Sequence, residues 1–107
     1  MKKFTVVVTP EAQAGIKESF LYIHERAPLN GERWLRRLYA LISTLEEFPE
    51  RCAYARERDY LEEDLRQLIF ISHRVVFRVD KASRTVAVLH VRHSNRRAVG
   101  EPEEEES

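Results

Sequence analysis

Apolar residues recur at helical spacing in the middle of this chain but not near its two ends, and this difference restricts the possible folds more than any other feature. Between residues 12 and 48 apolar side chains recur at every third or fourth position, as on one face of an amphipathic helix. Pro28 interrupts the pattern, so two antiparallel helices joined by a short turn are predicted. The two apolar stripes consist of Ala12, Ile16, Phe20, Ile23 and Ala27, and of Trp34 or Leu35, Leu38, Leu41, Ile42, Leu45 and Phe48.

The segments before and after the stripes have the composition of strands. Residues 4–8 are β-branched or aromatic, and 65–71, 74–80 and 85–93 are rich in apolar residues, so these four segments are predicted to be strands. The short polar segment 81–83 predicts a tight turn, so the last three strands form a meander. The predicted fold is therefore α+β, in the order β-α-α-β-β-β, with two antiparallel helices packed on an antiparallel sheet.

Local signals predict where the helices begin and end. Thr9, followed by a proline, is a favourable N-cap for the first helix, and Asn30 is predicted to cap the second. Pro49 is predicted to follow the end of the second helix. Residues 49–64 are polar and irregular, and we expect a connecting loop with a helical turn near 60–63.

A net charge of zero conceals a marked asymmetry along the chain. Five of the 18 acidic residues lie within 101–107, so residues 1–100 carry a net charge of +5. Residues 66–97 contain eight basic residues and one acid, which indicates a surface that faces negative charge. A chain of 107 residues suffices for one domain, predicted to span 1–100, and the segment 101–107 is predicted to be an acidic disordered tail.

Several classes of protein and site are disfavoured. No apolar run approaches the roughly 20 residues needed to cross a bilayer, so no membrane association is expected. Cys52 is the single cysteine, which leaves no intramolecular disulfide and favours the reducing cytoplasm. His90 and His93 would fall on opposite faces of a strand, and no tetrahedral ligand set is evident, so neither a metal nor a cofactor is expected.

Strand parity predicts where the positive charge of the second half lies. Successive side chains of a strand point to opposite faces, and one face of the sheet must pack on the helices. The other face is interpreted either as an inert solvated surface or as one that binds a negatively charged partner, and the repulsion among like charges favours the second. Parity assigns Arg74, Arg78, His90 and Arg92 to this open face, and it places Val86 and Val88 on the same side as His90. On the strand of Arg74, the residues that share the opposite face are Val75, Phe77 and Val79. On the strand of His90, they are Ala87, Leu89 and Val91.

The chain resembles the ParE/RelE toxin superfamily, which includes plasmid-stabilisation toxins, over roughly residues 3–98. No single motif is specific, but five of them occur in the order and spacing typical of the family. They are Val8-Thr9-Pro10-Glu11-Ala12, Leu45-Glu46-Glu47-Phe48-Pro49-Glu50, Leu65-Arg66-Gln67-Leu68, His73-Arg74-Val75-Val76-Phe77-Arg78-Val79 and Val88-Leu89-His90-Val91-Arg92-His93-Ser94-Asn95-Arg96-Arg97.

The resemblance implies a curved antiparallel sheet carrying two helices, and it implies the toxin half of a type II toxin–antitoxin pair. RelE-like members cut messenger RNA on the ribosome without a metal, whereas ParE-like members inhibit DNA gyrase or a similar topoisomerase without being nucleases. Both kinds are neutralised by a cognate antitoxin, for which an acidic partner is expected here. A homodimer and a hetero-oligomer with the antitoxin both remain open.

Two absences favour the ParE-like branch, and hence a protein that is not an enzyme. Arg74 matches the position of a RelE-type catalytic arginine, but no tyrosine follows Arg92, and residues 49–66 contain no lysine pair. If the chain is nevertheless a metal-independent endoribonuclease, the residues expected to act are Arg74, His90 and Arg92. The residues that the resemblance and the charge pattern predict for binding and toxicity are Arg74, Arg78, Arg92, His93, Arg96 and Arg97.

Overall fold

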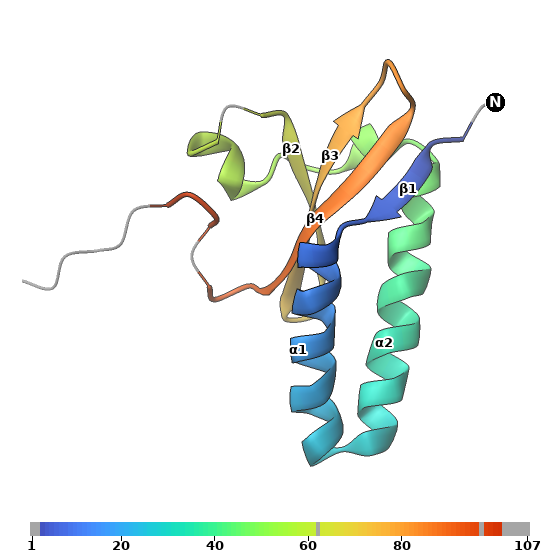
Figure 1. Cartoon of the computed structure of the whole chain (residues 1–107), viewed down its shortest axis with the longest axis vertical. Helices are drawn as coiled ribbons and strands as arrows, with labels where there is room; N and C mark the ends of the chain where they lie inside the picture. Colours follow the sequence, from blue (N-terminus) through green and yellow to red (C-terminus); the bar gives the residue numbers. More distant parts are fainter. Residues whose placement is uncertain (1–2, 62, 97, 102–107) are drawn as a thin grey trace, which may run out of the picture.

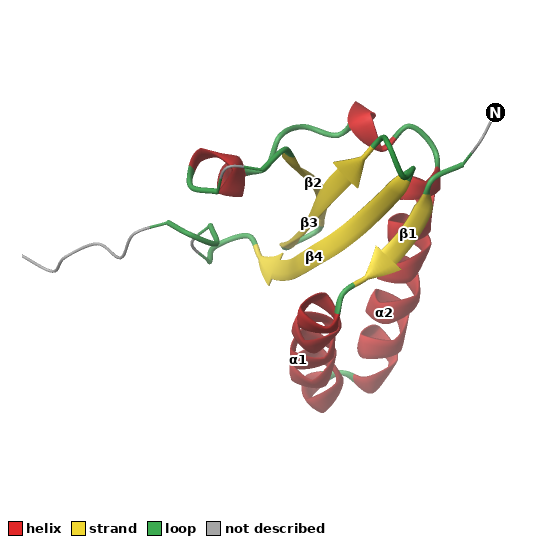
Figure 2. Ribbon diagram, turned by 45° about the horizontal axis from the view of Figure 1, so that its top comes forward, coloured by secondary structure: helices red, strands yellow, loops and turns green. Residues whose placement is uncertain are grey.

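Two antiparallel helices lie against one face of a four-stranded sheet in the computed structural model (Figures 1 and 2). The structure describes residues 3–61, 63–96 and 98–101. The α+β class and the element order β-α-α-β-β-β are confirmed. The strands and helices are β1 (Thr5–Val8), α1 (Pro10–Arg26), α2 (Pro28–Ser43), β2 (Leu65–Phe70), β3 (His73–Asp80) and β4 (Thr85–His93), with single 3-10 turns at η1 (Thr44–Glu46), η2 (Pro49–Arg51) and η3 (Arg56–Asp59).

The start of α1 is as predicted, and the start of α2 is not. Thr9 caps α1, because its Oγ1 accepts a hydrogen bond from the Ala12 amide at 3.2 Å. α2 begins at Pro28 with Ala27 in the cap position, so the prediction of Asn30 as a cap is wrong. Proline suits a first helical position, and here it ends one helix and begins the next almost without a linker.

The apolar stripe of α2 is shorter than predicted. Leu38, Ile42 and Leu45 are buried, but Leu41 is only half-buried. Phe48 lies outside the stripe, with 61% of its surface exposed and a φ of 47°. α2 ends at Ser43, since the chain tightens there into a 3-10 turn and the helical spacing no longer applies.

The sheet has the strand order β1-β4-β3-β2. β2, β3 and β4 form the predicted antiparallel meander, whereas β1 pairs in parallel with β4, so that the sheet is mixed. Alternation of apolar residues marks a strand but carries no information about its partner or its direction, which is why β1 could not be placed from the sequence.

A β-bulge in β4 changes which residues face the helices. Val76 pairs with His90 and Phe77 pairs with Val88, so Leu89 is an extra residue between two register positions. Val88 is consequently buried on the helix side together with Val91, three positions later. The faces predicted from strand parity are therefore wrong before the bulge, because Val86 and Val88 face the helices. They are correct beyond the bulge, because Val91 faces the helices as predicted.

The other sheet face is partly covered. The segment that contains η3 packs onto this face through a small apolar cluster. The cluster consists of Ala55, Leu65 and Val76, with Leu61 and Leu89 packed against them. The helical turn lies at η3 rather than at the predicted 60–63. No helix in the described part of the chain is long and apolar enough to cross a membrane. The predicted tail lies, from Pro102 onward, outside the described residues.

Candidate functional site

A recess of about 340 Å³ opens where α1 meets the C-terminal end of β4 and the β2–β3 hairpin. Its wall combines apolar side chains with serine, histidine and arginine side chains from three elements. The lining residues are Gly15, Glu18, Ser19, Tyr22, Ile23, Ser72, His73, Val91, Arg92, His93 and Arg96.

Close contact between α1 and β4 holds this recess together. A Cβ at Gly15 would lie 2.6 Å from the Val91 carbonyl oxygen, so only glycine allows the helix to approach the strand this closely. At the start of the helix, Thr9 Oγ1 also donates to the Val88 carbonyl at 2.8 Å. α1 therefore covers the edge of β4 beyond β1 and sets the width of the recess.

His73 is the most enclosed titratable group of the recess. Its Nε2 lies 3.0 Å from Ser19 Oγ, and its Nδ1 lies 3.2 Å from Ser72 Oγ. The Trp34 and His93 rings pack against it at 5.2 and 5.3 Å between centroids. Burial, and to a lesser degree the neighbouring His93, lower the pKa of His73, so the imidazole is neutral at pH 7.

The rim of the recess is basic. Arg92 and Arg96 both line it, and Glu18 is the single acid among the lining residues. Burial, followed by the charge of Arg96, lowers the pKa of Arg92, and within the described part of the chain Arg92 Nε has no hydrogen-bond acceptor. Two guanidinium groups at one rim are suited to binding an anionic group.

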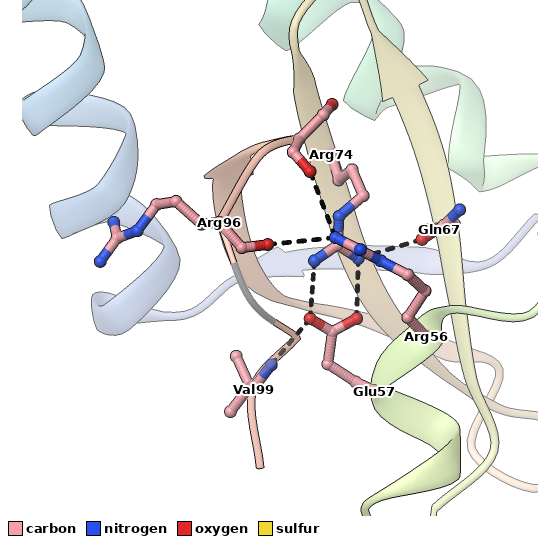
Figure 3. A network of polar contacts seen from close by, with 7 residues as sticks. Arg56, Glu57, Gln67, Arg74, Arg96 and Val99 are labelled. Carbon is pink, nitrogen blue, oxygen red and sulfur yellow. Dashed lines mark hydrogen bonds and ion pairs between the residues drawn. The ribbon is translucent and has the colours of Figure 1, made fainter. Parts of the chain in front are cut away.

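Arg74 lies on the sheet face that η3 covers, directly across from Arg92 in the β3–β4 register, and is not exposed. Its two Nη atoms donate to the two carboxylate oxygens of Glu57, both at 2.8 Å, and Nη1 also donates to Gln67 Oε1 at 3.0 Å (Figure 3). The side chains of Arg74 and Glu57 are 3% and 0% exposed. The prediction that Arg74 lies on an open basic face is therefore wrong, because η3 covers it and supplies its counter-charge.

The same segment holds the C-terminal part of the chain. Glu57 Oε2 accepts a hydrogen bond from the Val99 amide at 3.0 Å, and Arg56 Nη2 donates to the carbonyls of Ser94 and Arg96 at 3.2 and 3.1 Å (Figure 3). Burial raises the pKa of Glu57, but the hydrogen bonds from Arg74 and from the Val99 amide outweigh it and lower the pKa to about 2. Glu57 thus joins η3, β3 and the C-terminal segment.

The other predicted residues are distributed over three places. His93 and Arg96 are exposed beside Arg92 at the recess. Arg78, by contrast, forms an exposed ion pair with Glu63 at 3.1 Å, away from that group. The side chain of His90 is 13% exposed, its Nδ1 lies 3.6 Å from Glu11 Oε1, and its pKa is lowered mainly by burial. Arg97 lies outside the described residues.

Sequence reasoning overlooked Glu57, His73 and Ser19. Glu57 lies in an irregular polar loop, where no periodic pattern distinguishes a buried acid from an exposed one. His73 precedes Val75 by two positions, so parity could have placed it on the helix side. Among the described residues, no group of three or more His, Cys, Asp or Glu side chains is arranged to hold a metal ion.

Two solved structures of toxin–antitoxin systems have a similar fold. A chain of the chromosomal ParDE TA system from P. aeruginosa superposes with a TM-score of 0.70 at 13% identity, over 85% of this chain and 96% of that one. A chain of the toxin–antitoxin complex RelBE2 from Mycobacterium tuberculosis superposes with a TM-score of 0.59 at 22% identity, over 85% and 98%. At these identities the likeness concerns the fold.

The sequence itself gives a more specific result. No curated protein matches the chain significantly. Residues 6–98, however, match the family described as ParE toxin of the type II toxin-antitoxin system, parDE. This match spans both helices, three complete strands, all of β1 except Thr5, and the recess, and the chain therefore belongs to the ParE toxin family of type II toxin–antitoxin systems.

Proposed function

We propose that this ParE-family toxin acts by binding a DNA gyrase or topoisomerase-type target, not by cutting RNA, and that a cognate acidic antitoxin neutralises it. A target of this kind places its action in the cytoplasm. The working surface in this proposal is the basic rim formed by Arg92, His93 and Arg96. Arg97, the next residue in the sequence, and Arg78, which lies away from the rim in an ion pair with Glu63, are further contributors. The antitoxin forms a hetero-oligomer with the toxin in this scheme.

The state of Arg74 is the observation that carries the proposal. A metal-independent nuclease must direct positive charge at the phosphate in the transition state and must also move a proton. Arg74 occupies the position that resembles a nuclease arginine, yet its Nη atoms are both bound to Glu57 and its side chain is 3% exposed. A phosphate could reach this guanidinium only if η3 and the C-terminal segment left the sheet.

The rim, in contrast, is available to a partner. Arg96 is exposed, and Arg92 lines the same recess from β4. Apolar side chains such as Ile23 and Val91 adjoin these guanidinium groups, and a mixed apolar and basic surface fits an acidic protein surface. We therefore expect target and antitoxin to compete for this rim.

Ribosome-dependent cleavage of messenger RNA remains the second candidate. His90 lies close to Arg92, whose charge contributes to lowering the pKa of His90. In metal-independent cleavage an imidazole can transfer the proton and a guanidinium can stabilise the charge on the phosphate. This candidate needs Arg74 to be released from Glu57, and the binding mechanism does not.

The test combines growth with two biochemical readouts. Induction of the wild-type chain should arrest growth, and purified protein should inhibit supercoiling by gyrase. Arg92→Ala and Arg96→Ala should each weaken both effects about tenfold, since each removes a charged, bidentate donor. Arg36→Ala is the matched control, because Arg36 is an exposed arginine of α2 that does not line the recess.

Primer extension on messenger RNA from arrested cells separates the two mechanisms. We expect no codon-phased cuts. Cuts that disappear in a His90→Ala variant would replace the binding mechanism with the nuclease. Arrest that persists unchanged in Arg92→Ala and Arg96→Ala would show that the rim is not the working surface. Failure of the chain to co-purify with the product of a neighbouring reading frame would remove the antitoxin from the proposal.

A further inference from the structure

A second recess, of about 260 Å³, lies at the junction of α2 with the β2–β3 turn. It shares Ile23 with the first recess but contains none of the basic residues of the rim. Its lining residues are Ile23, Asn30, Arg33, Trp34, Arg37 and Ile71.

The α2 side of this recess presents two guanidinium groups that no acidic lining residue neutralises. Asn30, Arg33, Trp34 and Arg37 follow one face of the helix at helical spacing. Arg33 and Arg37 are exposed, and in the described part of the chain neither has an ion-pair or hydrogen-bond partner. Like charges four positions apart on a helix repel each other, and no acid lines the recess to offset this. An anion between the two guanidinium groups would relieve the repulsion.

The side of the recess that faces α2 is formed by Ile71, an exposed apolar residue in a strained backbone conformation. Ile71 has a φ of 54°, in the left-handed region that β-branched residues rarely adopt, and 72% of its surface is exposed. Backbone strain of this kind often marks a functional site. In this conformation Ile71 places a large apolar side chain beside the two unpaired arginines, Arg33 and Arg37.

We propose that this recess is a docking site for an acidic side chain of a partner polypeptide, whose apolar neighbour packs on Ile71. The carboxylate would bind between Arg33 and Arg37, and guanidinium groups pair with carboxylates through two parallel hydrogen bonds. A nucleic-acid backbone would satisfy the charges but would leave Ile71 and Ile23 without an apolar partner, so a polypeptide fits better. The proposal does not depend on the cellular target of the toxin.

The single tryptophan of the chain provides a direct reporter. Trp34 lines the recess, and its indole N–H gives one unambiguous resonance in an NMR spectrum. The probe is the capped tripeptide acetyl-Leu-Glu-Leu-amide, and the matched probe is acetyl-Leu-Gln-Leu-amide. We expect a saturable shift of the indole resonance with a Kd on the order of 1 mM for the glutamate peptide, and about tenfold weaker binding of the glutamine peptide.

Variants on the same helix separate the recess from general charge. Arg33→Ala and Arg37→Ala should each weaken binding of the glutamate peptide about tenfold, since each removes one arm of the charge pair. Arg36→Ala removes the same charge from an exposed position outside the recess and should stay within about twofold of wild type. Thermal unfolding confirms that each variant is folded.

Three results would overturn the proposal. The first is the absence of a saturable shift, or equal shifts with the glutamate and glutamine peptides. The second is an equal loss of binding in Arg36→Ala and in the two recess variants. The third is tighter binding of inorganic phosphate or of a hexathymidylate than of the glutamate peptide, which would assign the recess to a phosphate group, and in the second case to nucleic acid. Because no outcome involves gyrase or an antitoxin, failure here leaves the proposed toxin mechanism untouched.

Discussion

Arg74 and Glu57 form an ion pair that solvent does not reach. Removing two charges from water is costly, and the cost is offset only when the geometry is good and the remaining donors and acceptors are satisfied. Here the pair is bidentate, Gln67 accepts a further bond from Arg74, and the Val99 amide donates to Glu57, whereas Arg74 Nε has no hydrogen-bond partner among the described residues. The pair is thus a structural link between η3, the sheet and the C-terminal segment.

Replacing Glu57 by glutamine should destabilise the fold by about 3 kcal/mol, because Arg74 would remain buried without its counter-charge. Urea unfolding measures the loss. Glu63→Gln is the control, since the Glu63–Arg78 pair is about half exposed and such a pair contributes about 1 kcal/mol or less. Equal effects of the two substitutions would show that burial of the Glu57 pair does not matter.

The pKa of Glu57 also predicts a dependence on pH. This pKa falls from its ordinary value of 4.5 to about 2 in the folded chain, so the folded state favours the ionised carboxylate. The resulting stabilisation is complete above about pH 4.5 and is lost as the pH falls toward 2, by about 3 kcal/mol in total. The stability difference between wild type and Glu57→Gln should shrink across this window. A constant difference would contradict the lowered pKa.

At the scale of elements, the contact between α1 and β4 decides the shape of the candidate site. Gly15 is the point of closest approach, and the obstacle to a side chain there is the backbone oxygen of Val91, which cannot rotate away. Glycine weakens a helix interior by about 1 kcal/mol relative to alanine, so its presence here reflects packing and not helix propensity.

Gly15→Ala should therefore lower stability even though alanine favours the helix. The gain in propensity is about 1 kcal/mol, and displacing the helix from β4 costs about 1 to 3 kcal/mol. We expect a net loss of about 1 kcal/mol in thermal or urea unfolding, together with altered NMR resonances of Ser19 and His73. Lys17→Ala, at an exposed position of the same helix, should change stability by less than about 0.5 kcal/mol. A more stable Gly15→Ala variant would contradict the close contact.

At the scale of the whole molecule, charge is distributed unevenly along the chain. The 18 basic and 18 acidic residues balance only because four glutamates, Glu103 to Glu106, lie near the end. Without them the chain would carry 18 basic and 14 acidic residues. The four glutamates therefore lower the net positive charge of the molecule, and this net charge affects how strongly the molecule is attracted to any polyanion.

Truncation after Glu101 should increase the affinity of the chain for heparin and shift its elution to higher salt, because the net charge rises to +4. Stability should stay within about 0.5 kcal/mol of wild type, since Glu101, which accepts a hydrogen bond from Tyr60, is retained. Exchanging the four glutamates for glutamine at full length is the matched control and should reproduce the shift. If only truncation shifts elution, the effect comes from chain length and not from charge.

How far the candidate site could be predicted depended on the range of the interactions involved. Arg92, His93 and Arg96 are close in sequence, and the structure places them at one recess. Their neighbours Ser19 and His73 come from distant segments of the chain, and no pattern in the local sequence indicates that these two side chains meet. Arg74 was placed on the correct sheet face but assigned the wrong environment, because the loop that covers it has no periodic pattern.

Local rules sufficed for the elements of this fold. Apolar spacing, the Thr9 cap and the proline between the helices act within a few residues, so the sequence alone determined the two helices, the meander and the element order. Contacts between distant segments decided the rest: the parallel pairing of β1 with β4, the bulge at Leu89 and the burial of Arg74 under η3. Each of these depends on which surfaces meet in three dimensions, and a one-residue bulge is enough to reverse the faces that strand parity predicts.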